Sequence, residues 1–142
     1  MPSPSPASNL IPPRRAASRL ASFRHAFAGW WYMLRTQRNA WIHATISTLV
    51  FLAGLWLGLN RMEWAIILLT IALVWMAEFV NTALEAVVDL ASPDLHPLAK
   101  IGKDVGAAAV LIGSIAAMVV GLLILGPPLW AKVIILFGAP GL

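Results

Sequence analysis

The amino-acid sequence predicts an all-α integral membrane protein, in which one amphipathic surface helix is followed by three transmembrane helices. The first observation is composition: 60% of the 142 residues are hydrophobic and 11% are charged, whereas soluble domains have about 25% charged residues. The second is the presence of several apolar runs of about 20 residues, the length at which an α-helix crosses the hydrocarbon core. The third is an N-terminal region in which aromatic residues and arginines recur at helical spacing.

The distribution of charge sets the expected orientation in the membrane. Six of the ten lysines and arginines precede residue 40, and basic residues that flank membrane segments generally remain on the cytoplasmic side. We therefore expect a multi-pass protein of the inner (cytoplasmic) membrane with a cytoplasmic N-terminus. Anionic lipid head groups suit this basic region better than nucleic acid, because the charges adjoin membrane segments. The sequence has no cysteine, which excludes disulfides and thiolate metal sites.

The N-terminal region divides into a lead-in and a surface helix. Residues 1–13 contain five prolines and several serines, a composition that predicts a disordered segment. Residues 14–38 predict a helix that lies in the membrane interface, because aromatic and apolar side chains alternate there with arginines. The aromatic and apolar positions are Phe23, Phe27, Trp30, Trp31 and Leu34.

Three apolar segments predict the transmembrane helices. They cover residues 42–59, 63–89 and 105–125. The connection at 60–62 is so short that the first two spans must be antiparallel neighbours. Small residues along the third span permit close helix packing. The Gly-Pro-Pro sequence at 126–128 is expected to end this span, which leaves an apolar tail at 127–142.

Four polar side chains share one face of the second span. Glu78, Asn81, Glu85 and Asp89 are spaced by three, four and four residues, which places them within roughly 60° of one another on a helix. A charge inside a membrane segment costs at least about 2.5 kcal/mol and usually faces a partner or a wet cavity. At about 1.5 Å per residue, Glu78 lies inside the membrane near its cytoplasmic boundary and Glu85 at that boundary. Two carboxylates there suit metal binding or proton transfer.

Other polar residues flank the spans and leave alternatives open. His43 begins the first span, where a single histidine is more often an interfacial residue than a ligand. Lys103 and Asp104 directly precede the third span. Two interpretations without catalysis remain: an oligomeric proton or cation pathway lined by Glu78 and Glu85, or a structural protein whose acids pair with basic residues. The pathway gives no account of Lys103 and Asp104.

Two stretches resemble the prokaryotic diacylglycerol kinase family. They are AEFVNTALEAVVD at residues 77–89 and KDVGAAAVL at 103–111, and the order of elements agrees over about residues 20–126. Residues 92–100, SPDLHPLAK, look closest to the undecaprenol kinase branch. The resemblance implies a lipid kinase domain at 14–126, a homotrimer with shared active sites, and transfer of the γ-phosphate of MgATP to the hydroxyl of a membrane lipid alcohol. Both undecaprenol and diacylglycerol remain possible acceptors.

The resemblance also implies roles for individual residues. Glu78 resembles the general base that takes the proton from the lipid hydroxyl. Glu85 resembles the ligand of Mg²⁺, and Asn81 helps to position both carboxylates. Asn81, Lys103 and Asp104 resemble residues that bind the nucleotide and its phosphates, with Lys103 and Asp104 next to the phosphates and the reacting hydroxyl. These roles agree with the needs of phosphoryl transfer, namely positioning, a metal on the phosphates and a cation for developing charge.

One position departs from the pattern of the family. Gln37 stands where the family often has a metal-binding glutamate, and its neutral side chain offers an oxygen but no charge. The departure concerns the stoichiometry or affinity of metal binding and leaves the pair of Glu78 and Glu85 in place. The sequence also contains no GxxxxGK[ST] phosphate loop, so a nucleotide would have to be held by this separate arrangement of residues.

Overall fold

The computed structural model describes residues 19–92 and 96–138, and all of their regular structure is α-helical. The helices are α1 (Arg19–Thr36), α2 (Arg38–Leu57), α3 (Arg61–Ala91) and α4 (Pro97–Leu136). By length and composition α2, α3 and α4 can each cross a membrane, which confirms the predicted helical membrane architecture. The predicted disordered segment at 1–13 lies outside the described residues.

The chain divides into two units after Tyr32, and most of α1 belongs to the first. Phe23, Phe27 and Trp31 on this helix each expose more than half of their surface. Large exposed aromatic side chains among arginines are typical of a helix that lies in a membrane interface. The helix ends at Thr36, two residues before the predicted boundary, because Gln37 has an extended backbone between α1 and α2.

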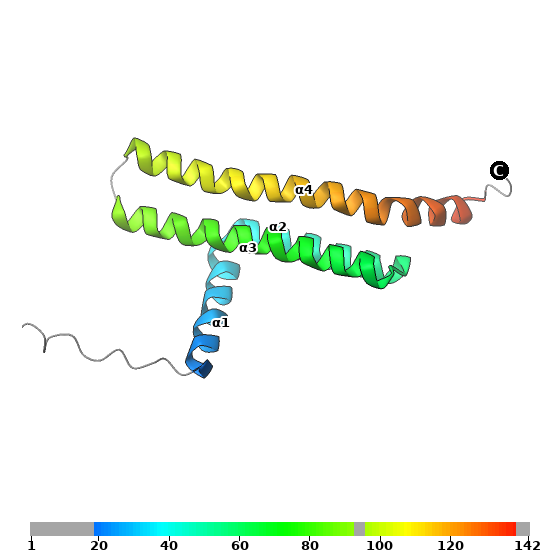
Figure 1. Cartoon of the computed structure of the whole chain (residues 1–142), viewed down its shortest axis with the longest axis horizontal. Coiled ribbons are helices and arrows are strands. Elements are labelled where there is room, and N and C mark those ends of the chain that lie inside the picture. Colours follow the sequence, from blue (N-terminus) through cyan, green and yellow to red (C-terminus); the bar gives the residue numbers. More distant parts are fainter. Residues whose placement is uncertain (1–18, 93–95, 139–142) are drawn as a thin grey trace, which may run out of the picture. The chain divides into compact units, whose positions relative to one another are not determined.

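The second unit contains α2, α3 and α4, with α3 and α4 antiparallel and side by side (Figure 1). A tight turn joins α2 to α3: Gly58 ends α2 in the left-handed region, at φ 77°, which glycine adopts without steric cost. Asn60 then caps α3 by accepting hydrogen bonds from the backbone N–H groups of Met62 and Glu63. The Glu63 carboxylate in return accepts the Asn60 N–H at 2.7 Å, a complete capping box. This turn makes α2 and α3 antiparallel neighbours, as predicted.

Close backbone approach brings α4 onto the polar face of α3. A Cβ atom added at Gly106 of α4 would collide with Oδ1 of Asn81 on α3. Gly106 is accordingly buried, while most side chains around it on α4 are exposed. The glycine therefore has a definite structural function, since it lets α4 pass directly over the Asn81 amide.

α4 is longer than the predicted third span at both ends. It begins at Pro97, because proline is favourable in a first helical turn. The His96 ring caps this end by accepting a hydrogen bond from the Leu98 N–H at 3.2 Å. It also continues through Pro127 and Pro128 to Leu136, so the expected end at residue 126 is wrong. Proline removes backbone hydrogen bonds but keeps a helical φ, and membrane helices tolerate this loss.

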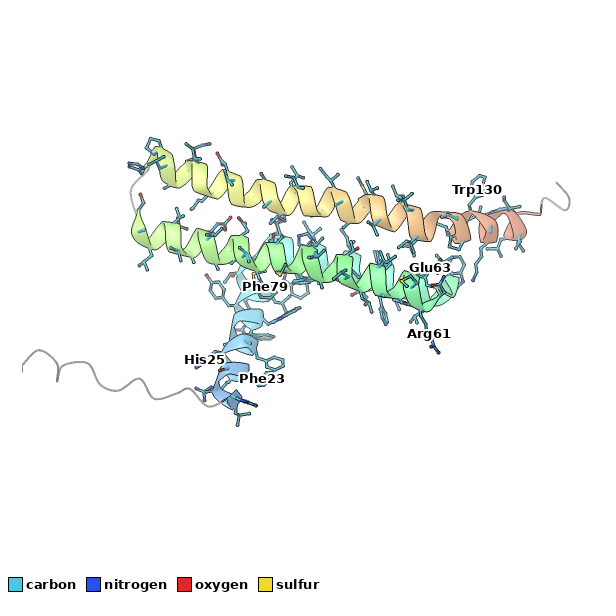
Figure 2. The ribbon with its side chains drawn as sticks, viewed as in Figure 1. Phe23, His25, Arg61, Glu63, Phe79 and Trp130 are labelled. Carbon is cyan, nitrogen blue, oxygen red and sulfur yellow. The ribbon has the colours of Figure 1, made fainter. Side chains whose placement is uncertain are left out.

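A contact with α2 supports this α4 extension, defined as residues 127–136. The Lys132 ammonium donates a hydrogen bond to the Trp56 carbonyl near the end of α2. It also lies 4.7 Å from the centroid of the Trp56 ring, which adds a cation–π interaction. Trp130, in the same extension, lies at the end of the molecule where α3 begins with Arg61 and Glu63 (Figure 2).

Candidate active site

The polar face predicted on α3 is buried where it packs within the second unit. Glu78 is 1% exposed, and Asn81 and Thr82 are each 7% exposed. They are the buried polar residues of the described chain. Fully buried carboxylates are rare unless they are paired, so burial singles out Glu78 among the five acidic residues that the structure describes. Farther along α3, Glu85 is half-buried and the Asp89 side chain is largely exposed.

Asn81 connects the buried and half-buried parts of this face. Its side-chain amide donates a hydrogen bond of 3.0 Å to Oε1 of Glu85, one turn away. Its Oδ1 atom is buried beside Gly106 and has no hydrogen-bond partner within the described chain. Buried polar atoms without a partner are uncommon and call for an explanation, such as a catalytic role. The amide therefore orients Glu85 and presents one unsatisfied acceptor at the contact between α3 and α4.

Glu78 has an equally unusual environment. Its Oε2 atom is buried and accepts no hydrogen bond from any residue that the structure describes. Nε2 of His43 on α2 lies 3.9 Å from it. This separation is longer than a hydrogen bond but within range of an ion pair. A buried carboxylate oxygen without a hydrogen-bond partner is uncommon, and a catalytic role is one explanation of it.

The remaining charges form two ion pairs at the start of α4. Lys103 crosses to α3 and contacts Oδ1 of Asp89 at 2.5 Å. Lys100 contacts Oδ2 of Asp104 at 2.6 Å, one turn along α4 and in an exposed position. The structure thus brings Lys103 to the polar face of α3, whereas Asp104 in the single chain is engaged with Lys100.

These ion pairs also bear on the interpretation that the acids serve only to pair with basic residues. Asp89 and Asp104 do pair with lysines. Glu78 and Glu85, however, form no ion pair with a lysine or arginine in the ranges 19–92 and 96–138. A purely structural role accounts for two of the acids and leaves the two innermost carboxylates unexplained.

The capacity for metal binding rests on few residues of this chain. The described residues contain no group of three or more histidine and acidic side chains that could hold a metal ion. Gln37, the residue before α2, makes no capping hydrogen bond with its side chain. Mg²⁺ requires only one or two carboxylates when phosphate oxygens and water complete its coordination. Glu85 fits that requirement in the presence of a nucleotide, with Gln37 as a neutral second candidate.

Sequence reasoning undervalued His43, which we treated as an ordinary interfacial residue. Its side chain is 13% exposed and faces Glu78. Two residues in contact with this region were also unassigned: Trp75, whose ring lies 6.2 Å from that of His43, and Ser47, which accepts the Trp75 indole N–H at 3.2 Å. Helical spacing could have indicated them. His43 and Ser47 lie one turn apart on one helix face, and Trp75 and Glu78 lie nearly one turn apart on another, so each pair shares a face.

Comparison with known proteins decides the family. The family model for prokaryotic diacylglycerol kinase matches residues 24–125. The chain belongs to this family. The kinase family match contains every residue of the polar face and both lysine–aspartate pairs, and it ends just before the α4 extension.

Individual relatives within the kinase family carry two different names. A diacylglycerol kinase of Synechocystis is 47% identical over 115 residues, which cover 80% of this chain and 66% of the relative. An undecaprenol kinase of Bacillus subtilis is 42% identical over 108 residues, covering 76% of this chain and 88% of the relative. A diacylglycerol kinase of Escherichia coli is 32% identical over 95 residues, which cover 62% of this chain and 78% of the relative. The chain thus spans about two thirds of the Synechocystis protein and most of the other two.

Proposed function

We propose that this protein is an ATP-dependent lipid kinase that transfers the γ-phosphate of MgATP to the hydroxyl of a membrane lipid alcohol. The observation that carries the proposal is the buried Glu78 carboxylate, whose Oε2 has no hydrogen-bond partner in the described chain. It lies about one turn from the Asn81–Glu85 pair, on a helix long enough to span a membrane. Diacylglycerol and undecaprenol are the candidate acceptors, because relatives carry both names.

The proposed reaction begins with removal of a proton. Glu78 accepts the proton of the lipid hydroxyl, and the resulting oxygen attacks the γ-phosphorus. The bond between the γ-phosphorus and the oxygen that bridges to the β-phosphate breaks, and ADP leaves. Burial of Glu78 excludes water from the base, which disfavours transfer of phosphate to water instead of lipid.

The other residues of the site act on the nucleotide. Glu85, oriented by the Asn81 amide, would hold Mg²⁺, which when bound neutralises charge on the β- and γ-phosphates. Gln37 is the weaker candidate ligand, because it is neutral. Lys103 would exchange its contact with Asp89 for the phosphates and stabilise the charge that develops on them. Asp104 would act beside the reacting hydroxyl.

A shared active site in a homotrimer accounts for features that the single chain leaves incomplete. Asp104 lies on an exposed side of α4, and among the described residues its ion pair is with Lys100 of the same helix alone. Large apolar side chains on α4, among them Ile112, Leu122 and Leu123, are about two thirds exposed. A second copy or lipid must cover such a face in the membrane. The basic N-terminal region supports a site on the cytoplasmic side of the inner membrane, where ATP is available.

Transfer of labelled phosphate from MgATP tests the function. Purified protein in mixed micelles would be given undecaprenol or diacylglycerol, with the Glu78→Gln variant beside the native chain. We expect Glu78→Gln to lower the rate at least about a hundredfold, the usual size of a general-base contribution. The matched control is Glu63→Gln, also on α3, because glutamine can replace glutamate in a capping box. We expect the control to retain most of the activity.

The outcomes discriminate among the interpretations. Transfer that depends on Glu78 supports the kinase, and the better acceptor identifies the physiological class. Absence of transfer to both lipids contradicts the proposal as stated. Proton or cation flux through vesicles in the absence of ATP would instead favour the pathway interpretation.

A further inference from the structure

The partner of Glu78 on α2 has no assigned role in the proposed reaction. We propose that His43 is a positioning residue: its imidazole faces the buried Glu78 carboxylate and keeps it oriented toward the lipid hydroxyl. The inference rests on the proposed function of Glu78 as the base. It adds a residue from α2 to a site otherwise built from α3 and α4.

The first support is the lack of another partner for Glu78. Its Oε2 atom is buried and unsatisfied within the described chain, and the ion pair recorded for it is with His43, at 3.9 Å. Few contacts therefore fix the orientation of this buried carboxylate, and His43 is placed to supply one.

The other charged groups around this site are engaged elsewhere or more distant along their helices. On α4, Lys103 contacts Asp89 and Lys100 contacts Asp104. On α3, Glu85 accepts the Asn81 amide. No other ion pair to Glu78 is recorded in the parts of the chain that the structure describes.

The second support is a contact that fixes the register between α2 and α3. The Trp75 indole N–H donates to Oγ of Ser47 at 3.2 Å, one turn from His43 on α2. The ring of Trp75 also lies 6.2 Å from that of His43, at an interplanar angle of 59°. Trp75 precedes Glu78 by three residues on α3, so the His43–Glu78 contact lies about one helical turn away from the Ser47–Trp75 contact, on the same side of both helices. Two neighbouring contacts thus hold the imidazole opposite the carboxylate.

The separation also suits the reaction. At 3.9 Å, His43 Nε2 and Glu78 Oε2 are too far apart for a direct hydrogen bond. A contact at that distance leaves free the Oε2 lone pair that must accept the substrate proton. His43 is also the more exposed of the two side chains, at 13% against 2%.

The activity test compares His43→Gln with His25→Gln, which changes a histidine of α1 in the first unit of the chain. Rates of lipid phosphorylation would be measured at neutral pH over a range of MgATP concentrations. We expect His43→Gln to lower kcat about tenfold, because the base is no longer held in place. KM for MgATP should change less than twofold, and His25→Gln should keep the native rate. An unchanged kcat, or a loss confined to KM, would overturn the proposal.

A measurement without turnover separates this proposal from the proposed function. The ¹⁵N chemical shifts of the histidine rings would be recorded in micelles for the native chain and for Glu78→Gln, with His43 assigned from His43→Gln. The chain has three histidines, so His25 and His96 serve as internal references. We expect the His43 ring nitrogens alone to shift in Glu78→Gln. Unchanged His43 signals would refute the pair even in an active kinase, whereas a shift in a chain that phosphorylates neither lipid would keep the pair and reject the kinase.

Discussion

Replacement of Gly106 by alanine tests the contact between α3 and α4 at the polar face. A Cβ atom at this position collides with Oδ1 of Asn81, so the amide must rotate or α4 must move. Rotation breaks the hydrogen bond from Asn81 to the Glu85 carboxylate, and hydrogen bonds to charged groups contribute about 1.5–3 kcal/mol. Alanine recovers about 0.5–1 kcal/mol of helix propensity. We therefore expect Gly106→Ala to lower the free energy of unfolding by about 1–2 kcal/mol.

The assay is equilibrium unfolding in detergent, together with activity as a function of Mg²⁺. Gly113→Ala is the matched control, because Gly113 lies two turns farther along the same side of α4 with no atom within 4 Å of an added Cβ. We expect this control to be neutral or slightly stabilising. In an Asn81→Ala background, Gly106→Ala should lose most of its cost, since the colliding atom is gone. Equal stabilities for Gly106→Ala and Gly113→Ala would refute the reasoning.

The remaining predictions concern the metal and the α4 extension. Glu85→Gln should raise the Mg²⁺ concentration needed for half-maximal activity about tenfold or more, because a charged ligand is lost; an unchanged requirement in a Mg²⁺ titration would exclude a metal role. Gln37→Glu should lower that requirement by adding a carboxylate, and weaker Mg²⁺ binding would count against this position as a ligand. Lys132→Met should lower stability by about 0.5–1 kcal/mol through loss of the Trp56 contact, with no change in KM for MgATP; thermal unfolding and kinetics of the same preparation test both statements.

The polar face of α3 was predictable because it depends on local spacing alone. Helical periodicity places Glu78, Asn81 and Glu85 together whatever the neighbouring helices do. The short turn at 60–62 likewise determined that α2 and α3 are antiparallel. The identity of the residue opposite Glu78 was not predictable, because it depends on the register of α2 against α3. That register is fixed by long-range contacts such as Trp75 with Ser47, which no spacing within one segment encodes.

The end of α4 was mispredicted for a different physical reason. Two consecutive prolines in water generally end a helix, since they remove backbone hydrogen bonds and clash with the preceding turn. In an apolar segment the helix remains the best available conformation for the other backbone groups. The hydrogen bond and the cation–π interaction of Lys132 with Trp56 further stabilise the residues beyond the prolines. In lipid, two consecutive prolines therefore need not end a helix.

α4 is longer than the hydrocarbon core of a bilayer is thick. Its 40 residues extend about 60 Å, roughly twice the thickness of the hydrocarbon core. The contacts of Lys103 with Asp89 and of Gly106 with Asn81 fix the acidic face of α3 beside the N-terminal part of α4. A thinner or thicker bilayer moves the boundary along both helices by the same distance. The fatty-acid composition of the host membrane therefore decides how many of the polar side chains on α3 lie in hydrocarbon and how many at its surface.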